Sequence, residues 1–165
     1  MPDGVKLEGY WTRCLPQLRA AYGAICAYVC VHVELVVGNS TVEHFEPKKR
    51  RPGLAYEWSN YRYVCGTMNG RKSDYTDVLD PFVLRTTPFE LNFADFSINV
   101  RTDLNSALTA LALSTIGRLK LDSAECRQLR ANHYDEYLAG DISESKFRRE
   151  SPFVHAEARR LDLLR

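Results

Sequence analysis

The residues best suited to chemistry in this sequence lie between positions 43 and 72. Glu43 is followed directly by His44. Two asparagines and a lysine come after this pair, at Asn60, Asn69 and Lys72. Hydrolysis of a phosphodiester needs a base to deprotonate water, a divalent cation to take up negative charge, and cationic side chains to hold the phosphate backbone. Histidine has an ordinary pKa near neutrality, and carboxylate and amide oxygens are hard ligands for Mg²⁺ or Mn²⁺. The set therefore predicts phosphodiester hydrolysis.

Two further features bear on such a site. Neighbouring residues of a flat strand point to opposite faces, so Glu43 and His44 serve one site only if the strand bulges or ends there. The sequence 45–47, which ends in Pro47, favours such an end. A basic cluster follows at 48–51, and basic residues outnumber acidic ones across 44–72. This local excess indicates contact with a polyanion, although a solvated loop would have the same composition.

These segments resemble the HNH endonuclease family, which has a ββα-metal core. The similarity lies in four stretches: 42–48, 58–61, 65–72 and Leu79-Asp80-Pro81. In particular, the chain is similar to the small bacterial HNH proteins of antiphage systems such as Septu, in which the nuclease pairs with an ATPase. The resemblance covers residues 22–81 and extends more loosely into the C-terminal part. It implies a DNA endonuclease that uses one divalent cation, Mg²⁺ or Mn²⁺, and acts with a partner ATPase.

The resemblance also implies roles for individual residues. His44 matches the histidine that acts as general base on water, and Asn60 matches the asparagine that orders the loop and helps to orient this histidine. Glu43 and Asn69 match the ligands of the divalent cation. Lys72 matches a basic residue that contacts phosphate. The other cations expected at DNA are Arg71, Lys48 and Lys49.

Many members of the family also bind a structural zinc ion through two Cys-x-x-Cys knuckles. In this sequence Val29 and Met68 stand where two of those cysteines would be. Three thiols remain, at Cys26, Cys30 and Cys65, with no clear fourth ligand. Structural zinc is therefore the less favoured interpretation, because such sites are four-coordinate. We expect Val29 and Met68 to replace the metal by apolar packing.

Composition excludes several classes of protein. The chain has 165 residues, of which 45% are hydrophobic and 26% charged, so it is neither disordered nor a disulfide-rich scaffold. The net charge is only +1, and any polyanion must therefore be bound by a local patch. Five cysteines and no secretory signature predict a reduced, cytoplasmic protein. The most apolar stretch, 25–37, is too short and too polar to cross a membrane, which predicts no membrane partner.

The expected fold is α+β, in a single domain of residues 1–165. Apolar spacing predicts an N-terminal helix within 1–23, followed by a ββα-metal core at 24–81. Strands are expected at 25–37 and 41–45, and a short helix at 65–73. Residues 82–165 are expected to form a mostly helical extension, with a capping box at Asp122 and Glu125, and a helix that begins with Ser151-Pro152.

A second interpretation keeps the same fold without catalysis. The near-neutral charge and the incomplete cysteine knuckles favour a silent module that docks a partner protein or a nucleic acid. A zinc-only adaptor is a third interpretation. Several side chains are expected to have structural roles only, as packing aromatics, helix histidines or small buried thiols: Trp11, Tyr56, Trp58, Tyr61, Tyr63, His133, His155, Cys14 and Cys126.

Overall fold

In the computed structural model, which describes residues 7–84 and 86–165, helices are combined with two small antiparallel sheets of two strands each. This mixture agrees with the α+β class. The described chain divides into two units. Unit 1 contains residues 7–28 and 33–76, and unit 2 contains residues 29–32 together with 77–84 and 86–165. The first six residues of the expected 1–23 helix lie outside the described part.

Unit 1 is built on a β-hairpin. Strand β1 (Ser40–His44) pairs with strand β2 (Tyr61–Cys65), in a register that places Glu43 opposite Arg62 and His44 opposite Tyr61. Helix α2 (Gly66–Lys72) follows β2 directly. The remaining elements are the 3-10 helices η1 (Tyr10–Cys14), η2 (Pro52–Leu54) and η3 (Trp58–Asn60), and helix α1 (Leu15–Ala21).

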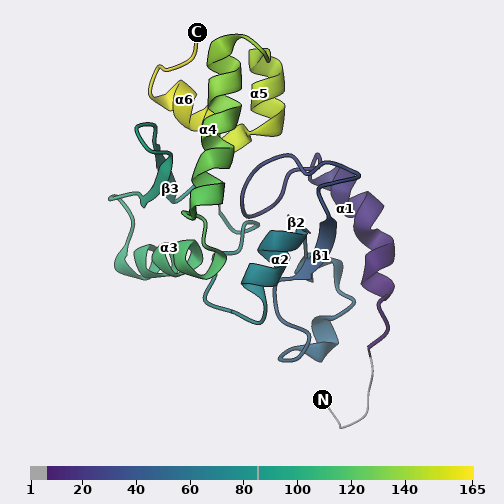
Figure 1. The fold of residues 1–165 in the computed structure, drawn as a ribbon. Helices are drawn as coiled ribbons and strands as arrows, with labels where there is room; N and C mark the ends of the chain where they lie inside the picture. The colour runs from purple at the N-terminus through teal and green to yellow at the C-terminus, as the bar shows by residue number, and fades with distance from the viewer. Residues whose placement is uncertain (1–6, 85) are drawn as a thin grey trace. The chain divides into compact units, whose positions relative to one another are not determined.

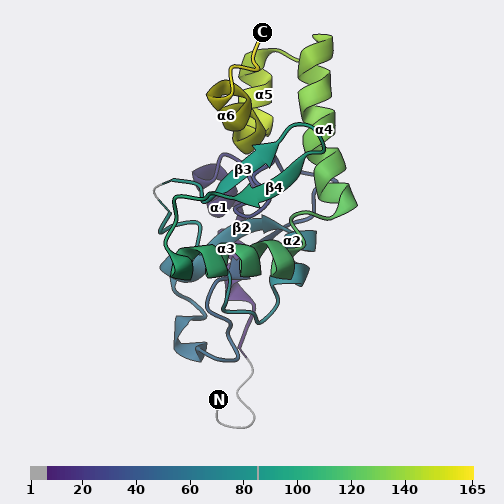
Figure 2. The same cartoon turned by 90° about the vertical axis from the view of Figure 1, so that its left-hand side faces the viewer.

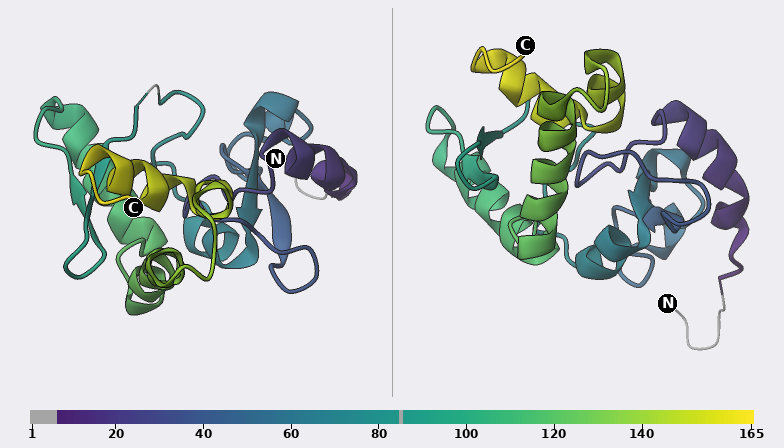
Figure 3. Two further views of the ribbon diagram at one scale, coloured as in Figure 1. Left: turned by 90° about the horizontal axis from the view of Figure 1, so that it is seen from above. Right: turned by 45° about the horizontal axis from the view of Figure 1, so that its top comes forward.

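Helices α1 and α2 lie on opposite faces of this hairpin (Figures 1 and 3). Alternation along β1 explains the arrangement, because its odd-numbered and even-numbered residues point to different faces. Thr41 and Glu43 meet side chains of α2, whereas His44 packs against Trp11 of η1. The two faces of one short strand are therefore covered by different parts of the chain.

Unit 2 contains a second hairpin and four helices. Strands β3 (Phe89–Asn92) and β4 (Ser97–Val100) pair in antiparallel fashion and lie between α3 and the C-terminal helices (Figure 2). The helices are α3 (Ser106–Leu119), α4 (Ala124–Ala139), α5 (Glu144–Glu150) and α6 (Pro152–Arg160). The apolar faces of α4, α5 and α6 meet strand β3 in one buried core, formed by Leu91, Tyr134, Tyr137, Phe147, Val154 and Ala158.

Four local predictions can be compared with these elements. The strand expected at 41–45 and the helix expected at 65–73 are confirmed as β1 and α2. The strand expected at 25–37 is wrong, because this segment consists mainly of turns with two isolated bridge residues, and Cys30 has a positive φ angle of 56°, which extended backbone excludes. The capping box at Asp122 is also wrong. Ser123 occupies the N-cap position of α4, and Asp122 instead accepts a hydrogen bond from the Ile98 backbone.

Candidate functional site

Glu43 and His44, the predicted metal ligand and the predicted general base, are the last two residues of β1. Their side chains point to opposite faces of the hairpin. The carboxylate of Glu43 lies on the α2 face. The side chain of His44, one residue later, lies on the opposite face, where it contacts Trp11 and Tyr61. No bulge brings the two side chains to one side, because the hairpin register runs without interruption to the His44–Tyr61 pair. The strand ends at His44, as the sequence 45–47 favours, but this end leaves the two side chains on opposite faces.

On the α2 face, Glu43 already holds a cation. The ammonium of Lys72 lies 3.0 Å from Glu43 Oε1 and donates a second hydrogen bond of 2.9 Å to the carbonyl oxygen of Phe45. The hydroxyl of Tyr28 donates to Glu43 Oε2 at 3.0 Å. Both partners of the ion pair are buried, with exposed side-chain fractions of 2% for Glu43 and 0% for Lys72. Burial raises the pKa of Glu43, and the charge of Lys72 opposes this rise.

Asn69 lies one helical turn before Lys72 and on the same face of the hairpin. Its amide nitrogen donates a hydrogen bond of 3.0 Å to Thr41 Oγ1, two residues before Glu43 on β1. The structure therefore gathers the side chains of Glu43, Asn69 and Lys72 between β1 and α2. It does not bring His44 into this group, and His44 and Asn69 lie on opposite faces of the hairpin.

On the other face, His44 is fixed by a main-chain carbonyl. Its Nε2 lies 2.9 Å from the oxygen of Ala55, which also accepts a hydrogen bond of 2.9 Å from the hydroxyl of Tyr61. Because a carbonyl oxygen only accepts, Nε2 carries the proton and Nδ1 is the basic nitrogen. Burial lowers the pKa of His44, and the nearby charges of Lys48 and Lys72 act in the same direction. The imidazole is therefore neutral at neutral pH, as a general base requires.

Asn60 closes the loop between the two strands. Its Oδ1 accepts a hydrogen bond of 2.7 Å from the Glu46 backbone, and its Nδ2 donates to the carbonyl oxygens of Glu46 and Leu54, each at 3.1 Å. Leu54 immediately precedes Ala55, whose carbonyl holds His44. Asn60 thus fixes the part of the loop that orients the imidazole, without contacting the imidazole itself.

The four cations expected at DNA have different surroundings. Lys49 is exposed and pairs with Asp74 at 3.2 Å, and Lys48 lies over the ring of Trp11, 3.8 Å from its centroid. Arg71 is half-buried on α2. Lys72 is buried and faces inward to Glu43, so its contact with a phosphate requires the side chain to leave this pair.

Two of the three thiols considered for zinc lie together. Cys26 Sγ lies 4.0 Å from Cys65 Sγ and accepts a hydrogen bond of 3.4 Å from the Cys65 backbone. Cys30 belongs to unit 2, where burial raises the pKa of its thiol. Within the described residues, no three or more histidine, cysteine, aspartate or glutamate side chains form a group that could hold a metal. Val29 and Met68, at the two altered knuckle positions, are both buried.

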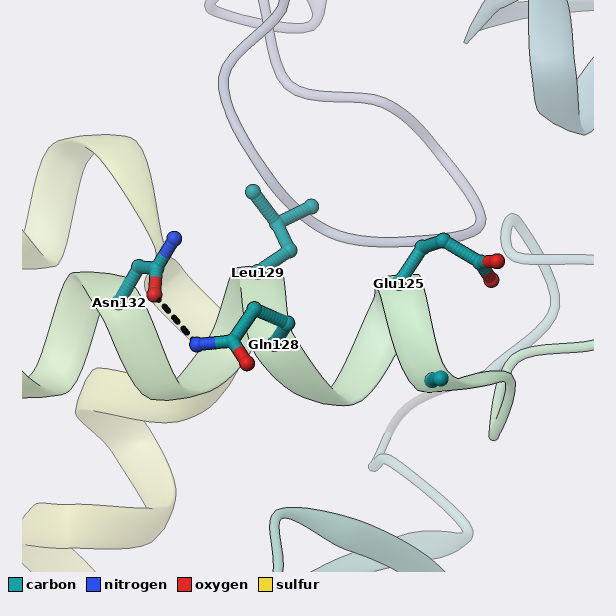
Figure 4. Close-up of a pocket in the computed structure, with 5 residues that line it drawn as sticks. Glu125, Gln128, Leu129 and Asn132 are labelled. Carbon is teal, nitrogen blue, oxygen red and sulfur yellow. Dashed lines mark hydrogen bonds between the residues drawn. The ribbon is translucent and has the colours of Figure 1, made fainter.

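Three groups that contact Glu43, Asn69 or Lys72 on the α2 face were not predicted from the sequence. Tyr28, the carbonyl of Phe45 and the hydroxyl of Thr41 each complete a contact described above. Tyr28 and Thr41 carry no motif, and a carbonyl is common to every residue, so only the fold reveals them. A surface hollow on α4 contains none of the predicted site residues. It is lined by Ala124, Glu125, Gln128, Leu129 and Asn132 (Figure 4).

No family model matches the sequence, and no curated protein matches it. Among the described residues, no helix combines the length and the apolar character needed to span a membrane. The function proposed below therefore rests on the geometry of the site.

Proposed function

We propose that this chain is a metal-dependent endonuclease of the HNH type, which hydrolyses phosphodiester bonds of DNA. One observation carries the proposal. At the end of β1, a carboxylate that holds a cation is followed directly by a neutral imidazole whose proton is fixed on one nitrogen. Because the two side chains lie on opposite faces of the strand, the proposal requires the end of β1 to turn so that both reach one phosphate. Water activation by a base and charge neutralisation by a cation are the two requirements of the reaction.

The donors around the ammonium of Lys72 suit a divalent ion. Glu43 supplies a carboxylate and Phe45 a carbonyl, and the amide of Asn69 lies on the same face. These are the hard oxygen ligands that Mg²⁺ and Mn²⁺ prefer, and the ammonium shows that the position accepts positive charge. Glu43 and Asn69 would hold such an ion once Lys72 has moved away. When bound, the ion would supply positive charge to the scissile phosphate and the leaving oxygen.

The protein's own groups have distinct tasks in this proposal. Nδ1 of His44 takes a proton from the attacking water, while the Ala55 carbonyl keeps the proton of Nε2 in place. Asn60 keeps the Leu54–Ala55 segment in position. After it has left Glu43, the ammonium of Lys72 is available to bind a phosphate oxygen, together with Lys48, Lys49 and Arg71. By the family resemblance, the partner would be an ATPase of an antiphage defence complex.

A second candidate is a silent module of the same fold, and one observation favours it. Both oxygens of Glu43 already have partners, and the Glu43–Lys72 pair is buried. In a silent module, this pair would be a permanent replacement for the metal, and the domain would dock a protein or a nucleic acid without cutting it. The two candidates differ in whether a divalent ion displaces the lysine.

Calorimetric titration with Mn²⁺ separates the two candidates. Under the nuclease proposal, the chain binds Mn²⁺, cuts plasmid DNA in Mg²⁺ or Mn²⁺, and stops cutting in EDTA. Asn69→Ala weakens Mn²⁺ binding, whereas Asn99→Ala, at an exposed position on β4, leaves it unchanged. The absence of both metal-linked heat and cleavage, even with a partner ATPase present, would instead support the silent module.

A further inference from the structure

A row of aromatic rings runs across the His44 face of unit 1. Each ring contacts the next, with centroid distances between 4.8 and 6.2 Å. In spatial order the row consists of Tyr10, Tyr56, Trp11, His44, Tyr61 and Trp58, and we call it the aromatic row. Its members come from η1, from the end of β1, from the loop between the strands and from β2. Folding therefore assembles the row from four separate segments.

The rings near the two ends of the aromatic row are open to solvent. The exposed fractions are 53% for Tyr10, 47% for Tyr56 and 49% for Trp58, whereas Tyr61 is only 3% exposed. Tyr56 and Trp58 do pack against neighbouring rings, as expected, but about half of each side chain also faces water. Exposed aromatic rings grouped in this way mark a surface that binds a partner.

Cations lie directly on the row. The guanidinium of Arg13 lies over Tyr10, 4.8 Å from the ring centroid, and the ammonium of Lys48 lies over Trp11 at 3.8 Å. Arg50 and Arg51 are exposed on the loop that leads to Tyr56. One acidic side chain is also present, since Glu57 is exposed between Tyr56 and Trp58. The hydroxyl of Tyr56 donates a hydrogen bond of 3.0 Å to the main-chain carbonyl of Glu8. The cations are thus grouped at the Tyr10–Trp11 end of the row and on the loop before Tyr56.

We infer that the aromatic row is a stacking surface for the unpaired bases of single-stranded DNA. This inference rests on the proposed function, because it names the form of DNA that would be presented to His44. Bases within a duplex already stack on one another, so exposed rings gain base contacts only from an unpaired strand. Interleaved cations bind the phosphates of the same strand. The centre of the row is buried, since His44 is only 8% exposed, so the bases would stack on the open rings near its two ends and the strand between them would pass over the proposed base.

Fluorescence anisotropy in EDTA tests binding separately from cleavage. The probe is a labelled oligothymidylate of about 16 nucleotides, compared with a duplex of the same length and with an abasic strand that keeps the phosphates. The thymidylate should bind about tenfold or more tightly than either competitor, since each stacked base contributes about 1–3 kcal/mol. Removing two open rings in Tyr10→Ala/Trp58→Ala should weaken binding of the thymidylate by about tenfold or more, without changing binding of the abasic strand.

Tyr75→Ala is the matched control, because it removes a tyrosine that is 39% exposed and lies outside the row. It should leave thymidylate binding unchanged. Equal or tighter binding of the duplex, equal binding of the abasic strand, or an unchanged affinity in the double variant would each overturn the inference. Binding that follows these expectations in a protein that never cleaves DNA would sustain the stacking surface and contradict the nuclease. Cleavage together with tighter binding of the duplex would sustain the nuclease and contradict the stacking surface.

Discussion

The ammonium of Lys72 lies 3.0 Å from the carboxylate of Glu43, and neither side chain reaches solvent. The two residues are 29 positions apart and come from the end of α2 and the end of β1. A buried ion pair of this kind is costly to form and costly to break, because each charge needs the other once water is excluded. The pair therefore ties α2 to the hairpin, and it also occupies the position proposed for a divalent cation.

Removing one member of this pair should destabilise the fold strongly. Glu43→Leu leaves a buried ammonium without its counter-charge, and we expect a loss of about 3–5 kcal/mol in the free energy of unfolding. The double variant Glu43→Leu/Lys72→Met should recover most of this loss, because an apolar pair fills the same space. Urea unfolding followed by tryptophan fluorescence measures both values, since Trp11 and Trp58 both belong to unit 1.

The exposed pair Lys49–Asp74 provides the control for this comparison. Lys49→Met should change the free energy of unfolding by only about 0–1 kcal/mol. If Glu43→Leu costs no more than this control, the buried pair does not hold α2 to the hairpin.

The side chain of Asn60 should stabilise the loop between β1 and β2 more than it stabilises the core. Asn60→Ala removes three hydrogen bonds and leaves the backbone groups of Glu46 and Leu54 without these partners. We expect a loss of about 1–3 kcal/mol and faster cleavage by trypsin within the basic stretch 48–51. Peptide mapping by mass spectrometry locates the cuts, with Asn99→Ala as the exposed control. Unchanged trypsin sensitivity of Asn60→Ala would show that its side chain does not close the loop.

Cys65 should be the most reactive thiol of unit 1 near neutral pH. The hydrogen bond from Cys26, supported by the backbone N–H groups of Thr67 and Met68, lowers the pKa of Cys65 to about 6 despite the opposing effect of burial. Its thiolate should therefore alkylate with a half-maximal rate near pH 6. Cys26→Ala removes the largest cause and should move this midpoint upward, whereas Cys14→Ala should not. Identical midpoints in the parent and in Cys26→Ala would contradict the thiol–thiol contact.

Unit 2 should lose stability in mild acid through His133. Burial lowers the pKa of this imidazole, against the opposing charges of Glu136 and Glu150, and its Nδ1 lies 2.8 Å from the hydroxyl of Ser151. As the pH falls below about 6.5, the unfolded chain takes up a proton before the folded one does, so the free energy of unfolding decreases. The loss is complete once the pH lies below the folded-state pKa.

Circular dichroism measures this effect, because it reports the helices of unit 2. His133→Asn removes the titrating group, and its free energy of unfolding should vary less between pH 7 and pH 5 than that of the parent. An equal pH dependence in both proteins would mean that His133 does not cause the acid sensitivity.

Local patterns predicted β1 and α2 because each signal lies within a few residues. Strand β2 was not predicted, although Tyr61–Cys65 is rich in aromatic and β-branched residues, because it is fixed by pairing with β1 twenty residues away. The apolar segment 25–37 misled the prediction. Its residues 29–32 belong to unit 2, where the His32 backbone bonds to Glu150, a contact that no local pattern contains.

In the site, too, features set by neighbouring residues were predictable, whereas features set by contacts between distant residues were not. Asn69 and Lys72 are three residues apart, and the short helix predicted at 65–73 is enough to bring them to one face, as the structure has them. Spacing did not reveal that Lys72 turns inward, because this depends on the carboxylate of Glu43 across the hairpin. Nor did composition distinguish the buried Tyr61 and Tyr63 from the half-exposed Tyr56 and Trp58.

Plasmid cleavage by His44→Ala tests the central claim most directly. The parent should cut plasmid DNA in Mg²⁺ and be inactive in EDTA. His44→Ala should lose cleavage while it retains its circular dichroism spectrum and its binding of DNA in EDTA. His44→Asn provides a second variant of similar size, and His133→Ala serves as the control in unit 2 and should still cut. Cleavage by folded His44→Ala at the rate of the parent would contradict the account.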